Sequence, residues 1–225
     1  MLKFLFSGLL MLCFLPQASH AQAAATEEKT DNQDRKKAKS DQKSFSDIIT
    51  AEMARDSGLF NIYQSGEKLY YEIPLDQLNK DMLLISRIVQ SPANLSPFTH
   101  AGSKVAEQVV HWELKHNKVL LKVMSFSNVA DEDLPIARSV DYNNFAPIIK
   151  SFKVEAMNVD STAVLVEVSK LFTDDVNALS GLNSGLRTRY KVSRLDGDRS
   201  FIDSARSFPI NVEVTHTMTY NAGSP

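Results

Sequence analysis

The sequence contains one cysteine, Cys13, and that residue lies inside an apolar run close to the N-terminus. Disulfide bonds, thiolate metal sites and a cysteine nucleophile are therefore excluded for all residues beyond this run. Small exported domains frequently depend on disulfide bonds for their stability. Without them, this chain has to be stabilised by its hydrophobic core and its hydrogen bonds.

An excess of charge of one sign is also lacking, because 25 basic and 27 acidic residues leave a net charge of −2. Nucleic-acid-binding proteins usually show a basic excess or a basic stripe. We therefore expect no nucleic-acid partner. The 225 residues suffice for one medium-sized domain or two small ones.

The chain has no apolar run long enough to span a bilayer. Its N-terminal run, Phe4 to Leu15, has about 12 residues, whereas a transmembrane helix needs roughly 20, which argues against a retained anchor. A lysine precedes the run, and Ser19-His20-Ala21 provides the small-x-small pattern that signal peptidase recognises. Residues 1–21 are thus predicted to be a cleaved signal peptide. We expect a periplasmic or extracellular protein with no membrane span after cleavage.

Residues 22–44 contain no Ile, Leu, Val, Met or aromatic residue, but they carry many acidic and basic side chains. Such a segment cannot bury enough apolar surface to offset the entropy that it would lose on ordering. We predict a disordered linker here. Acidic residues close to the basic stretch 35–39 favour a solvated linker over contact with anionic lipid.

Residues 45–100 are predicted to form a small N-terminal module. Ser46 is suited to cap a short helix, and Gly58 is suited to end it in a left-handed conformation. Residues 81–89 are apolar enough for a central strand. The rest of the module is predicted to contain a hairpin of strands at 59–63 and 68–73, a helical turn at 75–80 and a loop at 91–103.

Residues 101–225 are predicted to form a second, β-rich module, which we expect to continue beyond Pro225. Its clearest feature is a hairpin whose arms, 105–114 and 119–127, are rich in aromatic and β-branched residues. Residues 210–220 alternate apolar and polar side chains, which is typical of a half-buried strand. The remaining predictions are strands at 148–157, 163–168 and 189–195, short helices at 171–179 and 201–206, and loops at 131–135 and 182–186.

Antiparallel hairpins therefore dominate the predicted structure. The pattern does not alternate strands and helices as doubly wound folds do. The predicted fold class is α+β and β-rich, with antiparallel hairpins and a few short helices.

The nearest match to a zinc-protease motif is His111-Trp112-Glu113-Leu114-Lys115-His116. Zinc proteases use His-Glu-x-x-His, in which two histidines four residues apart share one helical face. A spacing of five separates the rings by about 140° on a helix and places them on opposite faces of a strand. We therefore expect no metal site here, since a strand that runs into its turn accounts for both histidines.

Other candidate motifs are incomplete. Gly181 to Gly185 does not match the Gly-x-Ser-x-Gly nucleophile elbow, and Asp196-Gly197-Asp198 lacks the rest of a calcium loop. The pairs Asp131/Asp133 and Asp174/Asp175 fall in predicted loops or helix ends, where solvated turn residues are expected. No catalytic, cofactor-binding or metal-binding residue is therefore assigned in this chain.

Four aromatic residues lie close together on the first predicted hairpin, and two interpretations are open. Phe60, Tyr63, Tyr70 and Tyr71 could line a carbohydrate or peptide groove. Aromatic residues on strands more often belong to the core or to cross-strand pairs. We favour the core.

Several short sequences, in the order and spacing in which they occur, resemble a family of secreted bacterial zinc-dependent metalloproteases. The similarity covers about residues 45–220. Asp56-Ser57-Gly58-Leu59-Phe60, Tyr70-Tyr71-Glu72-Ile73-Pro74 and Asp81-Met82-Leu83-Leu84-Ile85-Ser86-Arg87 resemble its short N-terminal module. Val109-Val110-His111-Trp112-Glu113, Ser127-Asn128-Val129-Ala130-Asp131, Pro147-Ile148-Ile149, Asp198-Arg199-Ser200-Phe201-Ile202 and Ser207-Phe208-Pro209-Ile210-Asn211 resemble the start of its next module.

In that family both modules lack an assigned function, and zinc is bound by a later, metzincin-like domain. The resemblance implies zinc in that downstream domain and no cofactor in this chain, which has no matching motif. It further implies that the chain is the non-catalytic N-terminal region of a metallopeptidase. Its partner would be the protease domain of the same polypeptide, for which it would support folding, mask the cleft or present a peptide or protein substrate.

The alternative is a function of a different class. The chain would then be a free-standing exported β-rich module that binds protein or glycan through its hairpins.

Overall fold

Tight hairpins are the units from which the main sheet is built. Gly66 has a φ of 56° in the two-residue turn of the first hairpin, a left-handed conformation that glycine adopts at little cost. His116 has a φ of 54° in a turn of the same length in the second hairpin. Both predicted hairpins are confirmed.

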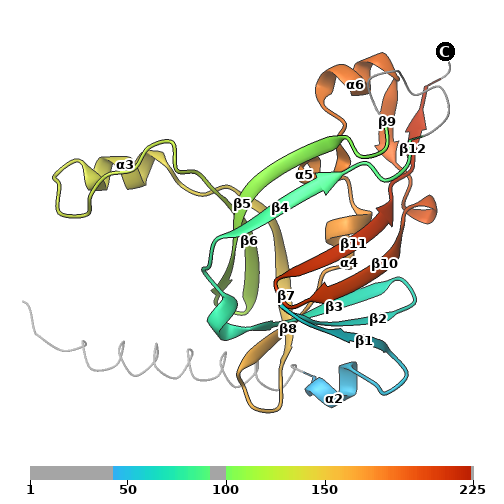
Figure 1. Ribbon diagram of the computed structural model, residues 1–225, viewed down its shortest axis with the longest axis horizontal. Coiled ribbons are helices and arrows are strands. Elements are labelled where there is room, and N and C mark those ends of the chain that lie inside the picture. Colours follow the sequence, from blue (N-terminus) through green and yellow to red (C-terminus); the bar gives the residue numbers. More distant parts are fainter. Residues whose placement is uncertain (1–42, 92–99, 224–225) are drawn as a thin grey trace, which may run out of the picture. The chain divides into compact units, whose positions relative to one another are not determined.

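A computed structural model describes residues 43–91 and 100–223, which belong to one compact unit. Eight strands form a single antiparallel sheet: β1 (Ala54–Ser57), β2 (Asn61–Ser65), β3 (Lys68–Pro74), β4 (Met82–Arg87), β5 (Lys104–Lys115), β6 (Lys118–Met124), β7 (Ile148–Met157) and β8 (Ala163–Glu167). Their order across the sheet is β1-β2-β3-β8-β7-β6-β5-β4 (Figure 1). The predicted α+β, β-rich class is confirmed, because antiparallel strands predominate and the described helices are short.

The strand order combines strands from residues 45–100 and 101–225, the two predicted modules. Strands β1 to β4 come from residues 45–100, and β5 to β8 come from residues 101–225. The segments meet twice, where β3 pairs with β8 and where β4 pairs with β5. Each segment therefore completes the hydrogen-bonded ladder of the other.

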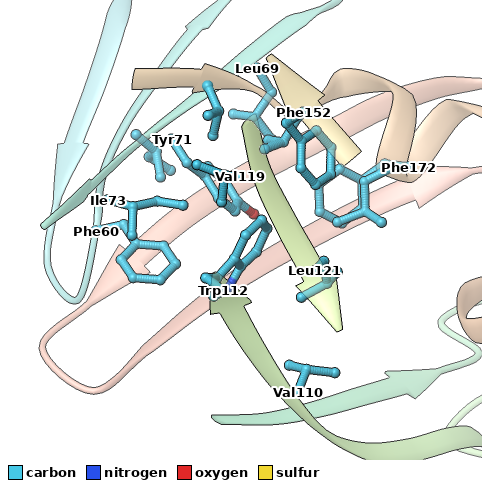
Figure 2. Packing of buried hydrophobic residues seen from close by; sticks show 14 of the residues in the cluster. Phe60, Leu69, Tyr71, Ile73, Val110, Trp112, Val119, Leu121, Phe152 and Phe172 are labelled. Atoms are coloured by element: carbon cyan, nitrogen blue, oxygen red, sulfur yellow. The ribbon is translucent and has the colours of Figure 1, made fainter. Parts of the chain in front are cut away.

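One face of the sheet, called the inner face below, carries a hydrophobic core around Trp112 (Figure 2). The Trp112 ring centroid lies 6.2 Å from those of Phe60 and Tyr71 and 5.6 Å from that of Phe152. These rings come from both sequence segments. Edge-on and tilted contacts of this kind add to the stabilisation from burial itself.

Elements that follow β8 in the sequence cover the inner face. They contribute Leu171, Phe172, Leu179 and Ile202 to the core. The covering elements are helices α4 (Ser169–Thr173) and α5 (Asn177–Ser180) and the hairpin of β10 (Phe201–Phe208) and β11 (Asn211–Thr217).

Helix α2 (Phe45–Ile48) packs on the opposite, outer face of the sheet, where the Phe45 and Tyr63 ring centroids are 6.0 Å apart. Its cap is Ser44 and not the predicted Ser46. The Ser44 hydroxyl accepts a hydrogen bond from the Asp47 backbone N–H, and the Asp47 carboxylate accepts one from the Ser44 N–H. This reciprocal pair needs an acidic or amide side chain three residues after the cap, which Ser46 lacks.

Other predicted strands also have counterparts in the structure. Predicted strands at 148–157 and 163–168 are confirmed as β7 and β8, and the alternating segment 210–220 contains β11. The remaining elements are η1 (Leu75–Gln77), α3 (Ala137–Asn143), α6 (Ser184–Arg189), η2 (Gly197–Arg199) and a two-stranded sheet of β9 (Val192–Leu195) and β12 (Tyr220–Ala222).

The predictions for β10, β4 and the segment before α6 are wrong. Residues 201–206 form strand β10 and not a helix, because they pair with β11, a partner that local periodicity does not reveal. Strand β4 lies at the edge of the sheet and not at its centre. The predicted loop at 182–186 leads into α6, which Asn183 caps by accepting a hydrogen bond from the Leu186 N–H at 2.9 Å.

The predicted signal peptide, residues 1–21, lies outside the described residues, as does the predicted linker up to residue 42. Among the helices that the structure describes, none combines the length and the apolar character that crossing a bilayer requires.

Gly58 does not end a helix, because α2 stops ten residues earlier and Gly58 has no positive φ. It lies against β10, where a Cβ atom on Gly58 would be 2.4 Å from the backbone oxygen of Phe208. The next residue, Leu59, donates its N–H to that same oxygen at 2.7 Å. Glycine is therefore required for the main sheet to contact β10 here.

We expect Gly58→Ala to lower the free energy of unfolding by about 1–3 kcal/mol, because the backbone of β10 must move to admit the methyl group. Urea unfolding at neutral pH measures this change. The control is Gly197→Ala, where an added Cβ meets nothing within 4 Å, so the change should stay within about 0.5 kcal/mol. Equal effects of the two substitutions would contradict the proposed contact.

Candidate functional site

The aromatic residues that were candidates for a ligand groove are buried. Phe60, Tyr63, Tyr70 and Tyr71 each expose at most 5% of their surface. The Tyr63 hydroxyl donates a hydrogen bond to the Glu72 carboxylate at 2.7 Å, which satisfies both buried groups. The core interpretation is confirmed.

The histidines that the structure describes do not gather into a cluster with other possible metal ligands. His111 on β5 contacts the Asp81 carboxylate, whereas His116 is exposed in the turn that follows β5. His216 on β11 packs on the Phe172 ring, and burial lowers its pKa. Within residues 43–91 and 100–223, no group of three or more His, Cys, Asp and Glu side chains could hold a metal ion.

The glycine-rich segment and the Asp-Gly-Asp segment have structural roles. Gly181 adopts a φ of 66° and ends α5, and Ser184 begins α6. Asp196 accepts hydrogen bonds from the Arg199 guanidinium at 3.0 and 2.8 Å, which closes the turn around η2.

Asp175 connects segments that are distant in the sequence, a role that no local pattern predicts. It accepts two hydrogen bonds from the Arg187 guanidinium, at 2.9 and 2.6 Å, and one from the Tyr220 hydroxyl at 2.9 Å. The hydrogen bond from Arg187 holds the pKa of Asp175 below its usual range. Through these hydrogen bonds Asp175 fastens α6 and β12 to the loop after α4. The neighbouring Asp174 pairs with Lys150 at 2.6 Å.

Within the part of the chain that the structure describes, the largest group of exposed apolar side chains lies between β6 and β7, on residues 125–147, called the arm below. The arm contains α3 and extends away from the sheet (Figure 1). None of its residues is buried. Tyr142 and Phe145 expose 73% and 72% of their surface, and the other large apolar residues of the arm that are exposed are Phe126, Val129, Leu134 and Ile136.

Polar contacts shape the arm without covering its apolar side chains. The Asn128 side-chain amide donates to that of Asn144 at 3.1 Å, which closes the base of the arm. The Lys122 ammonium lies 5.2 Å from the Phe145 ring centroid. Four acidic residues and one basic residue give the arm a net charge of −3. The predicted acidic loop at 131–135 belongs to it, and there the Asp131 carboxylate accepts from the Asp133 N–H at 3.2 Å.

The arm is the best candidate for a functional site among the described residues. Contiguous apolar patches on protein surfaces usually mark sites of contact with other proteins or ligands. Its exposed apolar side chains are suited to binding another surface. Local sequence pattern does not reveal the arm, because it does not show whether a distant segment covers an apolar residue.

Two family models match the chain. One describes a domain of unknown function, DUF5117, and matches residues 102–225, which is more than half of the chain. The other describes a domain of unknown function, DUF5118, and matches residues 42–91. No curated protein and no solved structure matches the chain.

Burial of Tyr63 makes the stability of the fold sensitive to high pH. Desolvation, helped by the hydrogen bond to Glu72, raises the pKa of Tyr63 to about 12. An unfolded chain ionises its tyrosines near pH 10, so this contribution is complete below pH 10 and is lost as the pH rises towards 12.

We expect Tyr63→Phe to lose less free energy of unfolding than the wild type between pH 10 and pH 12, measured by urea unfolding at several pH values. Tyr142→Phe is the control, because Tyr142 is exposed. This variant should keep the wild-type pH dependence. If the free energy of unfolding falls equally with pH in all three proteins, Tyr63 ionises normally.

Proposed function

The chain belongs to the DUF5117 family of domains of unknown function, and we propose that it forms the non-catalytic N-terminal region of a secreted zinc-dependent metallopeptidase. Its role is to support, mask or supply substrate to a protease domain that follows in the same polypeptide. The resemblance of residues 45–220 to the N-terminal modules of such enzymes supports this proposal. The signal-peptide pattern of residues 1–21 supports export.

The observation that carries the proposal is the uncovered arm. The aromatic and aliphatic side chains of the arm are exposed to water, which is unfavourable in free energy. A folded neighbour that covered them would remove this cost. A neighbour in the same polypeptide is present at a high effective concentration, so a modest contact area is enough. The net charge of −3 favours a neighbour with basic residues around an apolar patch.

Zinc belongs to the downstream domain in this proposal. Among the described residues, no group of three or more His, Cys, Asp and Glu side chains could hold the ion. The region would therefore influence catalysis through contact with the protease domain and not through a metal ligand.

The free-standing binding module is the second candidate. Its aromatic groove is no longer available, because Tyr63, Tyr70 and Tyr71 are buried. What still favours it is the arm, which could equally contact a separate protein.

We expect the native exported protein, detected with an antibody against residues 45–220, to be much heavier than 25.1 kDa, the mass of this chain. That species should contain zinc and cleave protein, whereas residues 22–225 should do neither. Intact mass, metal analysis and a casein assay check this. A native product near 25 kDa, or proteolysis by residues 22–225 alone, would contradict the proposal.

Hydrogen exchange tests the role of the arm. We expect amides of residues 125–147 to exchange at least about tenfold more slowly in the longer polypeptide than in residues 22–225, because a covering domain opens less often than a bare loop. Tyr142→Ser combined with Phe145→Ser should abolish that difference.

The control for this experiment is Val159→Ser in the turn between β7 and β8. Val159 exposes 87% of its surface but lies outside the arm. This variant should keep the slow exchange of the arm. Equal exchange of the arm in the long and short wild-type proteins would show that the downstream domain does not cover it.

A further inference from the structure

Strand β4 forms an edge of the eight-stranded sheet, and the one charged residue within it, Arg87, stands at its last position. It hydrogen-bonds to β5 on one side, and no other described strand pairs with it. Residues 82–86, Met-Leu-Leu-Ile-Ser, contain no charge and no proline. Native edge strands normally carry charges, prolines or bulges that prevent a second strand from adding to them.

The opposite edge of the sheet shows such protection. Strand β1 is short and carries Arg55 and Asp56. The Asp56 carboxylate accepts a hydrogen bond from the Ser207 N–H at 3.0 Å, so β10 lies against this edge. The two edges of one sheet therefore differ, which points to a role for the less protected edge, β4.

The side chains of β4 alternate regularly between the two faces. Met82, Leu84 and Ser86 are partly buried, whereas Leu83 and Ile85 expose 56% and 45% of their surface. Two large apolar side chains thus lie on the outer face, next to an unpaired backbone edge.

We propose that two copies of the chain pair through β4, antiparallel and about a twofold axis at Leu84. This register places Leu83 of each copy opposite Ile85 of the other, which covers both exposed side chains. It also places Asp81 opposite Arg87 on the same face. The segment is therefore complementary to itself in shape and in charge, as a twofold interface requires.

Neighbouring registers lack this complementarity. Moving the axis to Ile85 places Arg87 opposite Leu83, and moving it to Leu83 places Asp81 opposite Ile85. Placing the axis between two residues would set outer side chains opposite inner ones, which a pleated sheet does not allow.

The existing contacts of the two charged residues are compatible with pairing. Asp81 contacts His111 and yet its side chain is 60% exposed. One Arg87 nitrogen donates to the Gly102 carbonyl at 3.2 Å, and Arg87 is also exposed. The register irregularity beside Arg87 adds its extra residue to β5, so β4 itself stays regular.

Sedimentation equilibrium of the chain without its predicted signal peptide tests the proposal, and we expect a dimer. Ile85→Lys should raise the dimer dissociation constant at least about tenfold, because it places a charge within the apolar centre of the interface. Val159→Lys, which adds the same charge at an exposed apolar site outside the sheet edge, should leave the constant unchanged. Circular dichroism checks that both variants fold.

A charge exchange tests the register. Arg87→Asp sets two carboxylates opposite each other twice per dimer, which should weaken it by about three- to tenfold. Adding Asp81→Arg to this variant should restore the dimer. A monomer at every concentration, an Ile85→Lys variant that dimerises like Val159→Lys, or a double variant without rescue would overturn the proposal. Capture of an unrelated extended peptide at β4 by a monomeric chain would overturn it as well.

Discussion

Trp112 lies where the two halves of the chain meet, with its ring against Phe60 and Tyr71 from the first half and Phe152 from the second. Because no cysteine follows residue 13, this burial of apolar surface is the main source of stability that the chain has. Strands β3 and β4 pair with β8 and β5, so neither half has a complete ladder or a covered inner face without the other. The elements that follow β8, including α4, α5, β10 and β11, cover this core.

The elements after β8 cover the hydrophobic core on the inner face of the sheet, and a few specific contacts hold these elements in place. Gly58 lets the backbone of β10 approach the start of β2, and Asp175 ties α6 and β12 to the loop after α4 through Arg187 and Tyr220. These are charge-assisted or backbone contacts between distant segments. They hold Asp175, Arg187 and Tyr220 in contact with one another across three segments of the chain.

Two of the apolar surfaces that the described residues leave exposed differ in kind. The arm presents side chains on an acidic, irregular segment without an open backbone ladder, which suits contact with the surface of a folded domain. The edge of β4 presents an open backbone ladder flanked by Leu83 and Ile85, which suits another strand. A binding role is consistent with both, and the proposed place of the chain beside a protease domain would use the first.

Local chemistry in the sequence by itself determined the hairpins at Gly66 and His116, the half-buried strand that contains β11 and the α+β, β-rich class. Aromatic clustering on strands also correctly indicated that Tyr63 and Tyr71 are core residues. Only the tertiary structure decided that β4 is an edge strand, that residues 201–208 are extended and that Asp175 meets Arg187 and Tyr220. It also decided that the apolar residues of the arm stay exposed. Each of these features depends on partners far away in the sequence, and neither turn residues nor periodicity carries information about which distant segment will pair with which.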